Sequence, residues 1–259
     1  MAGPSSGNYA QGNITRYWDA HAEAYDCHEL SKIHRGPARQ AWAQAWSSAM
    51  PAPPAAVLDV GTGTGFAALL LADLGHQVTG IDLAPGMLAA ARARTAGMTN
   101  PPVFQLGDAV APPFAEANFD VVASRYLLWT LREPQRALAN WKALLRPGGW
   151  LVAVDGTWHA DGIHNTSASA DPSQREFLRL YDDKVVSALP LAEAQDIEDA
   201  VSLIRAAGFD QVETVPLPQI EQLQHSLVTD TCTRRDLRTQ FLIKARNPWQ
   251  ERLIGERQD

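Results

Sequence analysis

The segment from Val57 to Phe66 constrains the fold more than any other, because three glycines follow a short apolar run at regular spacing. Val57 to Val60 predicts a short buried strand, Gly61, Gly63 and Gly65 predict a tight turn, and an apolar helix is expected to begin where the turn ends. Glycines let a backbone approach a ligand closely, and the first helical turn offers unpaired N–H groups to it. The segment therefore predicts a strand, a turn and a helix that together bind a nucleotide-like ligand.

The spacing of the glycines narrows the choice of ligand. A dinucleotide-binding turn reads G-x-G-x-x-G, with its third glycine where the helix contacts the strand. Here Phe66 occupies that position, and the third glycine, Gly65, comes one residue earlier. Asp59, inside the strand, adds a carboxylate that would repel a pyrophosphate. Both features favour a cationic ligand without phosphate and argue against the alternative of an NAD(P) oxidoreductase.

The run Asp59-Val-Gly61-Thr-Gly63-Thr-Gly65 resembles motif I of the class I S-adenosylmethionine (SAM)-dependent methyltransferases, D-x-G-x-G-x-G, at every fixed position. The resemblance extends over residues 14 to 155. It includes the turn at Leu145-Arg-Pro-Gly-Gly149 and an N-terminal pattern, Tyr17-Trp18-Asp19 with Ala22 to Asp26, similar to that of many bacterial members that act on small molecules. It implies SAM as the cofactor and an α/β, Rossmann-like fold, with a mostly parallel seven-stranded sheet covered by helices on both faces.

The remaining pattern alternates strands with helices, as expected for a parallel sheet covered on both faces. The expected strands are 57–60, 77–81, 103–105, 119–123, 150–154, 212–215 and 240–245, and the expected helices of the core are 65–74, 85–96, 133–145, 173–186 and 192–207.

Three divisions of the chain are expected. Residues 1–12 are small and polar and are expected to be disordered, 13–50 to form an N-terminal helical cap with a helix at 36–49, and 51–259 to form the SAM-binding core. An insertion at about 156–191 follows the fifth strand of the core. Ligands of open α/β sheets bind beyond the carboxyl ends of the strands, so the cap and the insertion are expected to determine the substrate.

The amino-acid composition indicates which partners and which cellular location to expect. The chain has 22 basic and 29 acidic residues and a formal net charge of −7, without a long basic run, which argues against a nucleic-acid partner. Cys27 and Cys232 form neither a disulfide framework nor a C-x-x-C pair, as expected of reduced cysteines. No run approaches the roughly 18 apolar residues of a membrane span. We therefore expect a soluble, cytoplasmic protein with a small-molecule substrate, and both monomer and homodimer remain open.

Several acidic and aromatic residues are candidates for binding the cofactor. Asp82 ends the second strand roughly 20 residues after the turn, where a carboxylate can accept hydrogen bonds from ribose hydroxyls. The resemblance implies that Asp108 accepts from the adenine amino group and that Tyr25, with Tyr17 and Trp18 behind it, covers the methionine moiety. The full set of expected cofactor-binding residues is Tyr17, Trp18, Tyr25, Asp59, Gly61, Thr62, Gly63, Asp82, Leu83, Met87, Gly107, Asp108, Ala109, Ser124 and Arg125.

Tyr25, Arg125 and Tyr126 are the candidate catalytic residues. Arg125 is expected to pair with the SAM carboxylate or with an acidic group of the substrate, and a solvent-facing arginine is the alternative. Many similar proteins carry a histidine in place of Tyr126, and a phenol with a pKa of about 10 needs help to act as a base.

The substrate pocket is expected to draw on aromatic residues and histidines of the cap and the insertion. His28, His34, His159 and His164 are candidate general bases, although each is individually more typical of an ordinary polar residue. The residues expected to line the pocket are His34, Trp129, Trp158, His159 and Tyr181. No pair has the spacing of metal ligands such as H-x-x-x-H, so no metal is expected.

The expected reaction is transfer of a methyl group to an N, O or C atom of a small metabolite, in specialised metabolism. The methyl group of SAM is already activated, so positioning of the acceptor accounts for much of the catalysis. Two alternatives keep the cofactor. One is a cyclase of the same fold that converts SAM itself to azetidine-2-carboxylate and methylthioadenosine, and the other is a SAM-binding module without catalysis.

Overall fold

The computed structural model describes residues 6–26, 36–165, 172–227 and 239–249 of the 259-residue chain. The helices are α1 (Ser6–Ala20), α2 (Ala22–Tyr25), α4 (Gly36–Ala49), α5 (Phe66–Asp73), α6 (Pro85–Ala93), α7 (Pro134–Leu144), α8 (Pro172–Leu180), α9 (Asp183–Val186), α10 (Glu198–Ala206) and α11 (Pro218–Leu227), with the 3₁₀ turn η2 (Leu128–Thr130). The strands are β1 (Ala56–Val60), β2 (Gln77–Asp82), β3 (Val103–Leu106), β4 (Phe119–Arg125), β5 (Leu145–Gly156), β6 (Asp210–Pro216) and β7 (Gln240–Arg246).

These strands form one seven-stranded sheet in the order β3-β2-β1-β4-β5-β7-β6. β1 pairs in parallel with β2 on one side and with β4 on the other, and the pairs β2–β3 and β4–β5 are also parallel. Among the described strands, β7 alone runs antiparallel to its neighbours, β5 and β6. The predicted fold, a mostly parallel Rossmann-like sheet, is therefore confirmed. The order reverses between β1 and β4, and such a switch point opens a crevice at the carboxyl ends of the strands.

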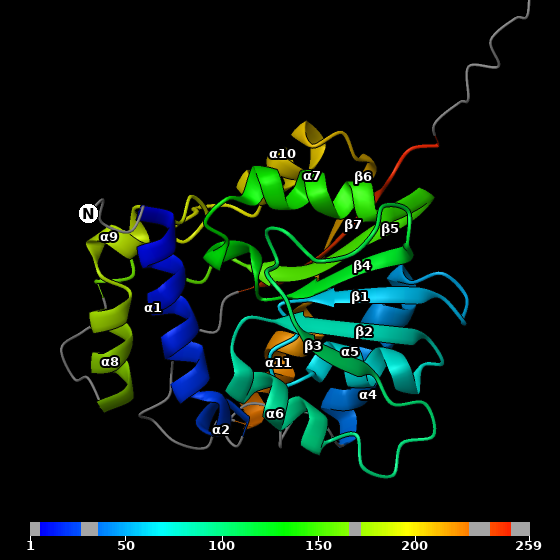
Figure 1. Cartoon of the computed structure of the whole chain (residues 1–259), viewed down its shortest axis with the longest axis horizontal. Coiled ribbons are helices and arrows are strands. Elements are labelled where there is room, and N and C mark those ends of the chain that lie inside the picture. The colour runs from blue at the N-terminus through cyan, green and yellow to red at the C-terminus, as the bar shows by residue number, and fades with distance from the viewer. Residues whose placement is uncertain (1–5, 27–35, 166–171, 228–238, 250–259) are drawn as a thin grey trace, which may run out of the picture.

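Helices cover both faces of the sheet (Figure 1). On one face α4, α5 and α11 pack against the sheet, and α5 is buried all along from Phe66 to Ala72, as its continuous apolar sequence requires. On the other face α7 and α10 bury Leu138, Trp141 and Ile204. β1 is buried on both faces, which agrees with its apolar run. The helices thus bury β1 on both faces, in the middle of the sheet.

A cap forms from two segments that are distant in the sequence, α1 with α2, and α8 with α9. Figure 1 shows these helices together at one end of the sheet. Their contact is aromatic, because Tyr17 of α1 packs against Phe177 and Tyr181 at ring-centroid distances of 5.2 Å and 5.8 Å. The cap is also fastened to the core, since the Asp19 carboxylate accepts a hydrogen bond of 2.6 Å from the Gly86 backbone N–H at the start of α6.

The observed elements differ from the predicted ones in several places. α1 begins at Ser6, inside the segment expected to be disordered. The helix predicted at 173–186 is two helices, because the Asp182 side chain caps the second one by accepting from the backbone N–H groups of Lys184 and Val185. The helix predicted to begin at 192 begins at Glu198. β5 already starts at Leu145, which pairs with Phe119, so the expected turn lies within the strand at a bulge. Neither η2 nor α11 was predicted.

We expect Gly65→Ala to lower the free energy of unfolding by about 2–4 kcal/mol, the sum of backbone strain and overpacking. Gly65 has a φ of +84°, and an added Cβ would lie 2.9 Å from Cζ of Phe104 and 3.1 Å from Cβ of Ala91. Gly97 is the matched control, because its φ is +80° but an added Cβ has nothing within 4 Å. Gly97→Ala is expected to cost only about 1 kcal/mol, the strain alone. Urea unfolding of both variants measures the difference, and equal costs would contradict the packing argument.

Candidate functional site

Asp59 holds the glycine turn together from inside the sheet. Its side chain is 1% exposed, and its Oδ2 accepts hydrogen bonds from the Thr62 hydroxyl at 2.6 Å and from the Ala68 backbone N–H in α5 at 3.2 Å. Burial raises the pKa of this carboxyl to about 7, against the lowering effect of these two hydrogen bonds. Within the described part of the chain, Oδ1 is buried without a hydrogen-bond partner. Asp59 therefore joins β1, the turn and α5, and keeps one acceptor oxygen unused.

The turn needs glycine for two different reasons. Gly61, Gly63 and Gly65 all have positive φ, at 64°, 54° and 84°. At Gly61 an added Cβ would collide with Leu127, 2.6 Å from its Cδ1, so packing excludes a side chain. At Gly63 the nearest atom to an added Cβ is Sδ of Met87 at 4.0 Å. The backbone at Gly63 thus faces open space, as expected where a ligand approaches the main chain.

Asp82 lies at the carboxyl end of β2, beside the same turn. Its Oδ2 accepts a hydrogen bond of 2.9 Å from the Gly63 backbone N–H, and its Oδ1 accepts one of 2.9 Å from that of Ala84. Burial raises the pKa of this carboxyl, against these hydrogen bonds. Each carboxylate oxygen offers two acceptor positions, so Asp82 can hold the turn and still accept hydrogen bonds from a ligand. Leu83 follows it directly in the loop to α6.

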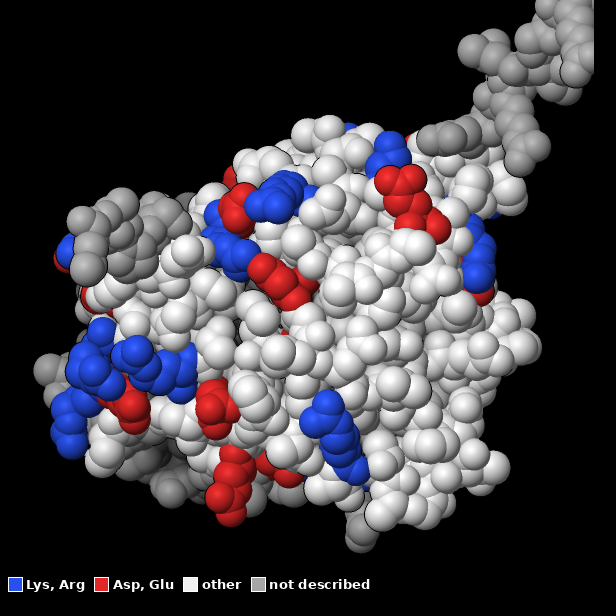
Figure 2. Space-filling model, in the orientation of Figure 1, with Lys and Arg blue, Asp and Glu red and all other residues white. Residues whose placement is uncertain are grey.

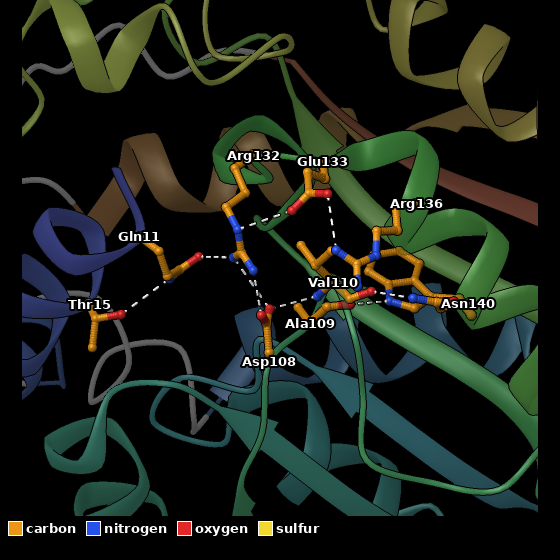
Figure 3. Close-up of polar contacts among 10 residues, drawn as sticks. Gln11, Thr15, Asp108, Ala109, Val110, Arg132, Glu133, Arg136 and Asn140 are labelled. Atoms are coloured by element: carbon orange, nitrogen blue, oxygen red, sulfur yellow. Dashed lines mark hydrogen bonds and ion pairs between the residues drawn. The ribbon is translucent and has the colours of Figure 1, made fainter. Parts of the chain in front are cut away.

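Asp108 follows β3 in the segment Gly107-Asp108-Ala109, at the same edge of the sheet. Its Oδ1 accepts from the Val110 backbone N–H at 2.8 Å, and its Oδ2 lies 2.5 Å from Nη2 of Arg132 (Figure 3). Gly107 is held close to β2, where an added Cβ would lie 3.0 Å from Cβ of Ile81. Asp82 and Asp108 thus lie at the carboxyl ends of the neighbouring strands β2 and β3, while Asp59 lies within β1.

Arg125 ends β4 on the other side of β1. Its guanidinium carbon lies 3.7 Å, 4.5 Å and 4.9 Å from the ring centroids of Tyr126, Phe66 and Trp42. Its charge also lowers the pKa of Asp59, as a minor contribution against burial. A pocket lies here, lined by Tyr25, Asp59, Gly61, Thr62, Gly63, Thr64, Phe66, Ala67 and Arg125. The interpretation of Arg125 as a solvent-facing arginine is therefore wrong, because three aromatic rings enclose it. Ser124, by contrast, is fully buried in the sheet.

The predicted aromatic residues of the cap face two different regions. Tyr25 lines the pocket, and Trp18 packs edge-on against it at a centroid distance of 5.5 Å. Tyr17 is 7% exposed and packs toward the insertion instead. Met87 is buried below the cap together with Ala22 and Ala84. Of the three aromatic residues, Tyr25 is the one placed at the turn.

Tyr126 adopts a positive φ of 57°, which is uncommon for a residue with a side chain. Its hydroxyl donates a hydrogen bond to Oε1 of Gln240, and its ring lies 4.6 Å from that of Trp158.

Asp155, close to Trp158, was not predicted from the sequence. Its buried carboxylate accepts from the backbone N–H groups of Leu128 and Gly156, at 2.7 Å and 2.9 Å, and from Nε1 of Trp158 at 2.6 Å. Burial raises the pKa of Asp155 to about 6, and its hydrogen bonds hold the loop after β4 against β5.

The residues predicted for a substrate pocket meet in one aromatic cluster. Trp129 lies 5.1 Å from the ring of His159 and 5.6 Å from that of Tyr181. Tyr181 is fully buried, its hydroxyl accepts a hydrogen bond of 3.0 Å from Nε1 of Trp18, and burial raises its pKa above the usual value for tyrosine. Tyr181 is therefore a neutral phenol inside the apolar core of the cap, and Trp129 stacks on its ring. The predicted His34 lies outside the described residues, as do His28, Cys27 and Cys232.

Among the residues that the structure describes, no group of three or more His, Cys, Asp or Glu side chains is arranged to hold a metal ion. None of the described helices combines the length and the apolar character that a membrane span requires. Figure 2 shows one face of the molecule, on which Lys and Arg side chains stand among Asp and Glu side chains rather than in a continuous basic stripe.

Sequence reasoning missed several residues of the site, among them Gln11, Thr64, Arg132, Asp155 and Gln240. Asp155 had a usable signal, because it follows the apolar run Leu151–Val154 as Asp82 follows Ile81. Arg132 had none, since its partner Asp108 lies 24 residues away.

Known proteins with similar sequences include methyltransferases. Residues 58–153 match a family described as a methyltransferase domain. The chain is 38% identical over 103 residues to a demethylmenaquinone methyltransferase of Renibacterium salmoninarum, covering 40% of this chain and 42% of that protein. It is 29% identical over 220 residues to one of Clavibacter sepedonicus, covering 78% and 84%.

Solved structures show the same fold. Phosphoethanolamine N-methyltransferase 2 of Haemonchus contortus, in complex with phosphomonomethylethanolamine and S-adenosylhomocysteine, aligns with a TM-score of 0.63 at 19% identity, over 96% of this chain and 62% of that one. Residues 58–153 of this chain are thus similar to methyltransferase domains, and the chain has the fold of solved methyltransferases. The matches to the first curated relatives span about half the length of those proteins, 42%, 50% and 46%.

The raised pKa of Asp59 predicts a pH dependence of stability. The folded state holds this proton to about pH 7, whereas an unfolded Asp releases it near pH 4, so the free energy of unfolding falls as the pH rises between these values. Asp59→Asn keeps an acceptor for Thr62 and Ala68 without the charge, and should remove a decline of a few kcal/mol. Urea unfolding at several pH values measures the slope. Asp73→Asn, at an exposed surface ion pair, is the control that should keep the decline. An unchanged slope in Asp59→Asn would show that Asp59 is ionised in the folded protein.

Proposed function

We propose that this protein transfers the methyl group of SAM to an N, O or C atom of a small metabolite, in specialised metabolism. The observation that carries the proposal is the set of acidic residues around the glycine turn. Asp59 lies within β1, Asp82 ends β2 and Asp108 follows β3, and the backbone at Gly63 faces open space beside Asp82. This arrangement supports an adenosine-containing cofactor, because Asp82 and Asp108 offer acceptors for the ribose hydroxyls and for an adenine amino group.

Different residues of the site bind different parts of the cofactor. Asp82 accepts hydrogen bonds from the ribose hydroxyls, with Leu83 beside it, and Asp108, between Gly107 and Ala109, accepts from the adenine amino group. Gly61, Thr62 and Gly63 present the backbone of the turn to the ligand, and Met87 lies below it. At the methionine end, Arg125 pairs with the carboxylate and the unused oxygen of Asp59 accepts from the amino group. Tyr25 covers this end, with Trp18 behind it.

When bound, SAM supplies a methyl group that is activated by the sulfonium to which it is attached. The protein then needs to hold the acceptor in line and keep water away, which Tyr25 and the aromatic cluster of the cap can do. Tyr126, which the strained backbone presents between Arg125 and Trp158, positions the acceptor through its ring. The side of the acceptor site that faces the insertion is formed by Trp129, Trp158 and His159, and the buried Tyr181 lies behind them.

Product analysis tests the reaction. The purified protein is incubated with methyl-labelled SAM and fractions of small metabolites, and the sulfur-containing product is identified by mass spectrometry. S-adenosylhomocysteine together with a labelled metabolite supports methyl transfer. Methylthioadenosine with azetidine-2-carboxylate would instead establish the cyclase alternative. Binding of SAM measured by calorimetry, without either product from any fraction, would favour a non-catalytic module.

We expect Asp82→Asn to weaken SAM binding about 10- to 100-fold, because an amide replaces a charged acceptor of two ribose hydroxyls. The Asn oxygen can still accept from the Gly63 backbone N–H, which keeps the turn in place, while the Ala84 N–H faces the amide NH₂ and loses its acceptor. Calorimetry gives the dissociation constant, and unfolding by urea checks that the variant is folded. Asp73→Asn, on the surface beside Arg39, serves as the control with wild-type affinity. Unchanged affinity in a folded Asp82→Asn protein would place the ribose elsewhere.

A further inference from the structure

Arg132 connects three segments that are distant in the sequence. It lies just before Glu133, at the start of α7, and its side chain is only 13% exposed. Its Nη2 lies 2.5 Å from Oδ2 of Asp108, and its Nη1 lies 3.5 Å from Oδ1 of the same carboxylate (Figure 3). Nη1 also donates to Oε1 of Gln11 in α1, and Nε lies 3.5 Å from Oε1 of Glu133. One guanidinium thus touches the loop after β3, the cap and α7.

These contacts leave Asp108 able to bind a further donor. A carboxylate has about four acceptor positions, two on each oxygen. Oδ1 accepts from the Val110 backbone N–H at 2.8 Å and faces Nη1, while Oδ2 is engaged, among the described residues, by Nη2 alone. One position on Oδ2 therefore remains for an N–H donor. The two-pronged contact with a guanidinium fixes the plane of the carboxylate and hence the direction of that position.

Gln11 extends this arrangement to the cap. Its Nε2 donates to Oγ1 of Thr15 at 3.2 Å, which turns Oε1 of the amide toward Arg132. The last turn of the same helix is fastened separately, because Asp19 accepts from the Gly86 backbone N–H. Between these two attachments α1 carries Trp18, which packs against Tyr25 at the pocket. The position of α1 over the site thus depends on the guanidinium that orients Asp108.

We propose that Arg132 is a positioning residue with two roles. It fixes the Asp108 carboxylate to accept the adenine amino group, and through Gln11 it couples recognition of the base to docking of α1. The proposal rests on the proposed function, since it takes Asp108 as the adenine-binding residue. It predicts that loss of Arg132 weakens discrimination at position 6 of the purine, which a merely structural role would not affect.

The test compares two ligands that differ in that position. S-adenosylhomocysteine has an amino group there, and S-inosylhomocysteine has an oxygen that cannot donate. The wild type should prefer the amino compound, and Arg132→Gln should bind it about tenfold more weakly and lose most of the preference. Arg136→Gln is the matched control, because Arg136 pairs with the same Glu133 at 3.2 Å, is 60% exposed, and takes no part in the contacts of Asp108. It should behave as wild type.

Double variants test the coupling to the cap. Gln11→Met removes the acceptor for Arg132 and should weaken binding of S-adenosylhomocysteine a few-fold while the preference for the amino group stays. Added to Arg132→Gln, the same change should have no further effect, because the connection is already lost. Full additivity of the two changes overturns the coupling. If Arg132→Gln does not fold, Arg132→Lys keeps a positive charge without the two-pronged contact and should also lose the preference.

Asp108→Asn separates this inference from the proposed function. Weaker binding in Asp108→Asn, combined with unchanged binding and preference in Arg132→Gln, overturns the inference and leaves Asp108 as the adenine site. Tighter binding in Arg132→Gln also overturns it, because Arg132 would then occupy the place of the base. Unchanged binding in Asp108→Asn overturns the inference together with the assignment of Asp108. The proposed reaction is judged independently, by the formation of S-adenosylhomocysteine from SAM.

Discussion

The geometry of the site depends on the hydrogen bonds that the buried side chain of Asp59 accepts. This residue lies in the central strand, and its hydrogen bonds reach the turn at Thr62 and the helix α5 at Ala68. The neighbouring Asp82 holds the same turn from β2 through the Gly63 backbone N–H. The turn is therefore fixed between two adjacent strands and one helix before any ligand binds. Such preorganisation reduces the ordering that a ligand must otherwise impose.

The parts of the fold that were predicted are those whose signals are local. The apolar run of β1, the glycine spacing after it and the acidic residues at strand ends each lie within a few residues, so a single sequence reveals them. The places of Asp82 at the end of β2 and of Asp108 just after β3 followed from these signals. The helix α4 at Gly36–Ala49 was predicted with its bounds, since glycine and the proline-rich run after Met50 delimit it.

The parts that were not predicted depend on contacts between distant segments. The role of Arg132 depends on its contacts with Asp108 and Gln11, which are 24 and 121 residues away in the sequence. The early start of α1 has a similar origin, because small polar residues predict disorder until Ala10 and Ile14 are buried against the insertion. Tyr181 was expected at a pocket wall, but its hydrogen bond with Trp18 and the surrounding rings place it in the core of the cap. The spacing of apolar residues along a chain shows which side chains are buried together. It leaves open which other segment covers them.

The construction of the cap has a consequence for how the chain folds during synthesis. Trp18 and Tyr181 are joined by a hydrogen bond across 163 residues of sequence. During synthesis Trp18 therefore precedes its partner Tyr181 by 163 residues, and their contact can form only after β1 to β5 have been made. Contacts of such long range form late, after the loop between them has closed. The glycine turn, which Asp59 and Thr62 hold together within three residues, has no such long loop to close before it forms.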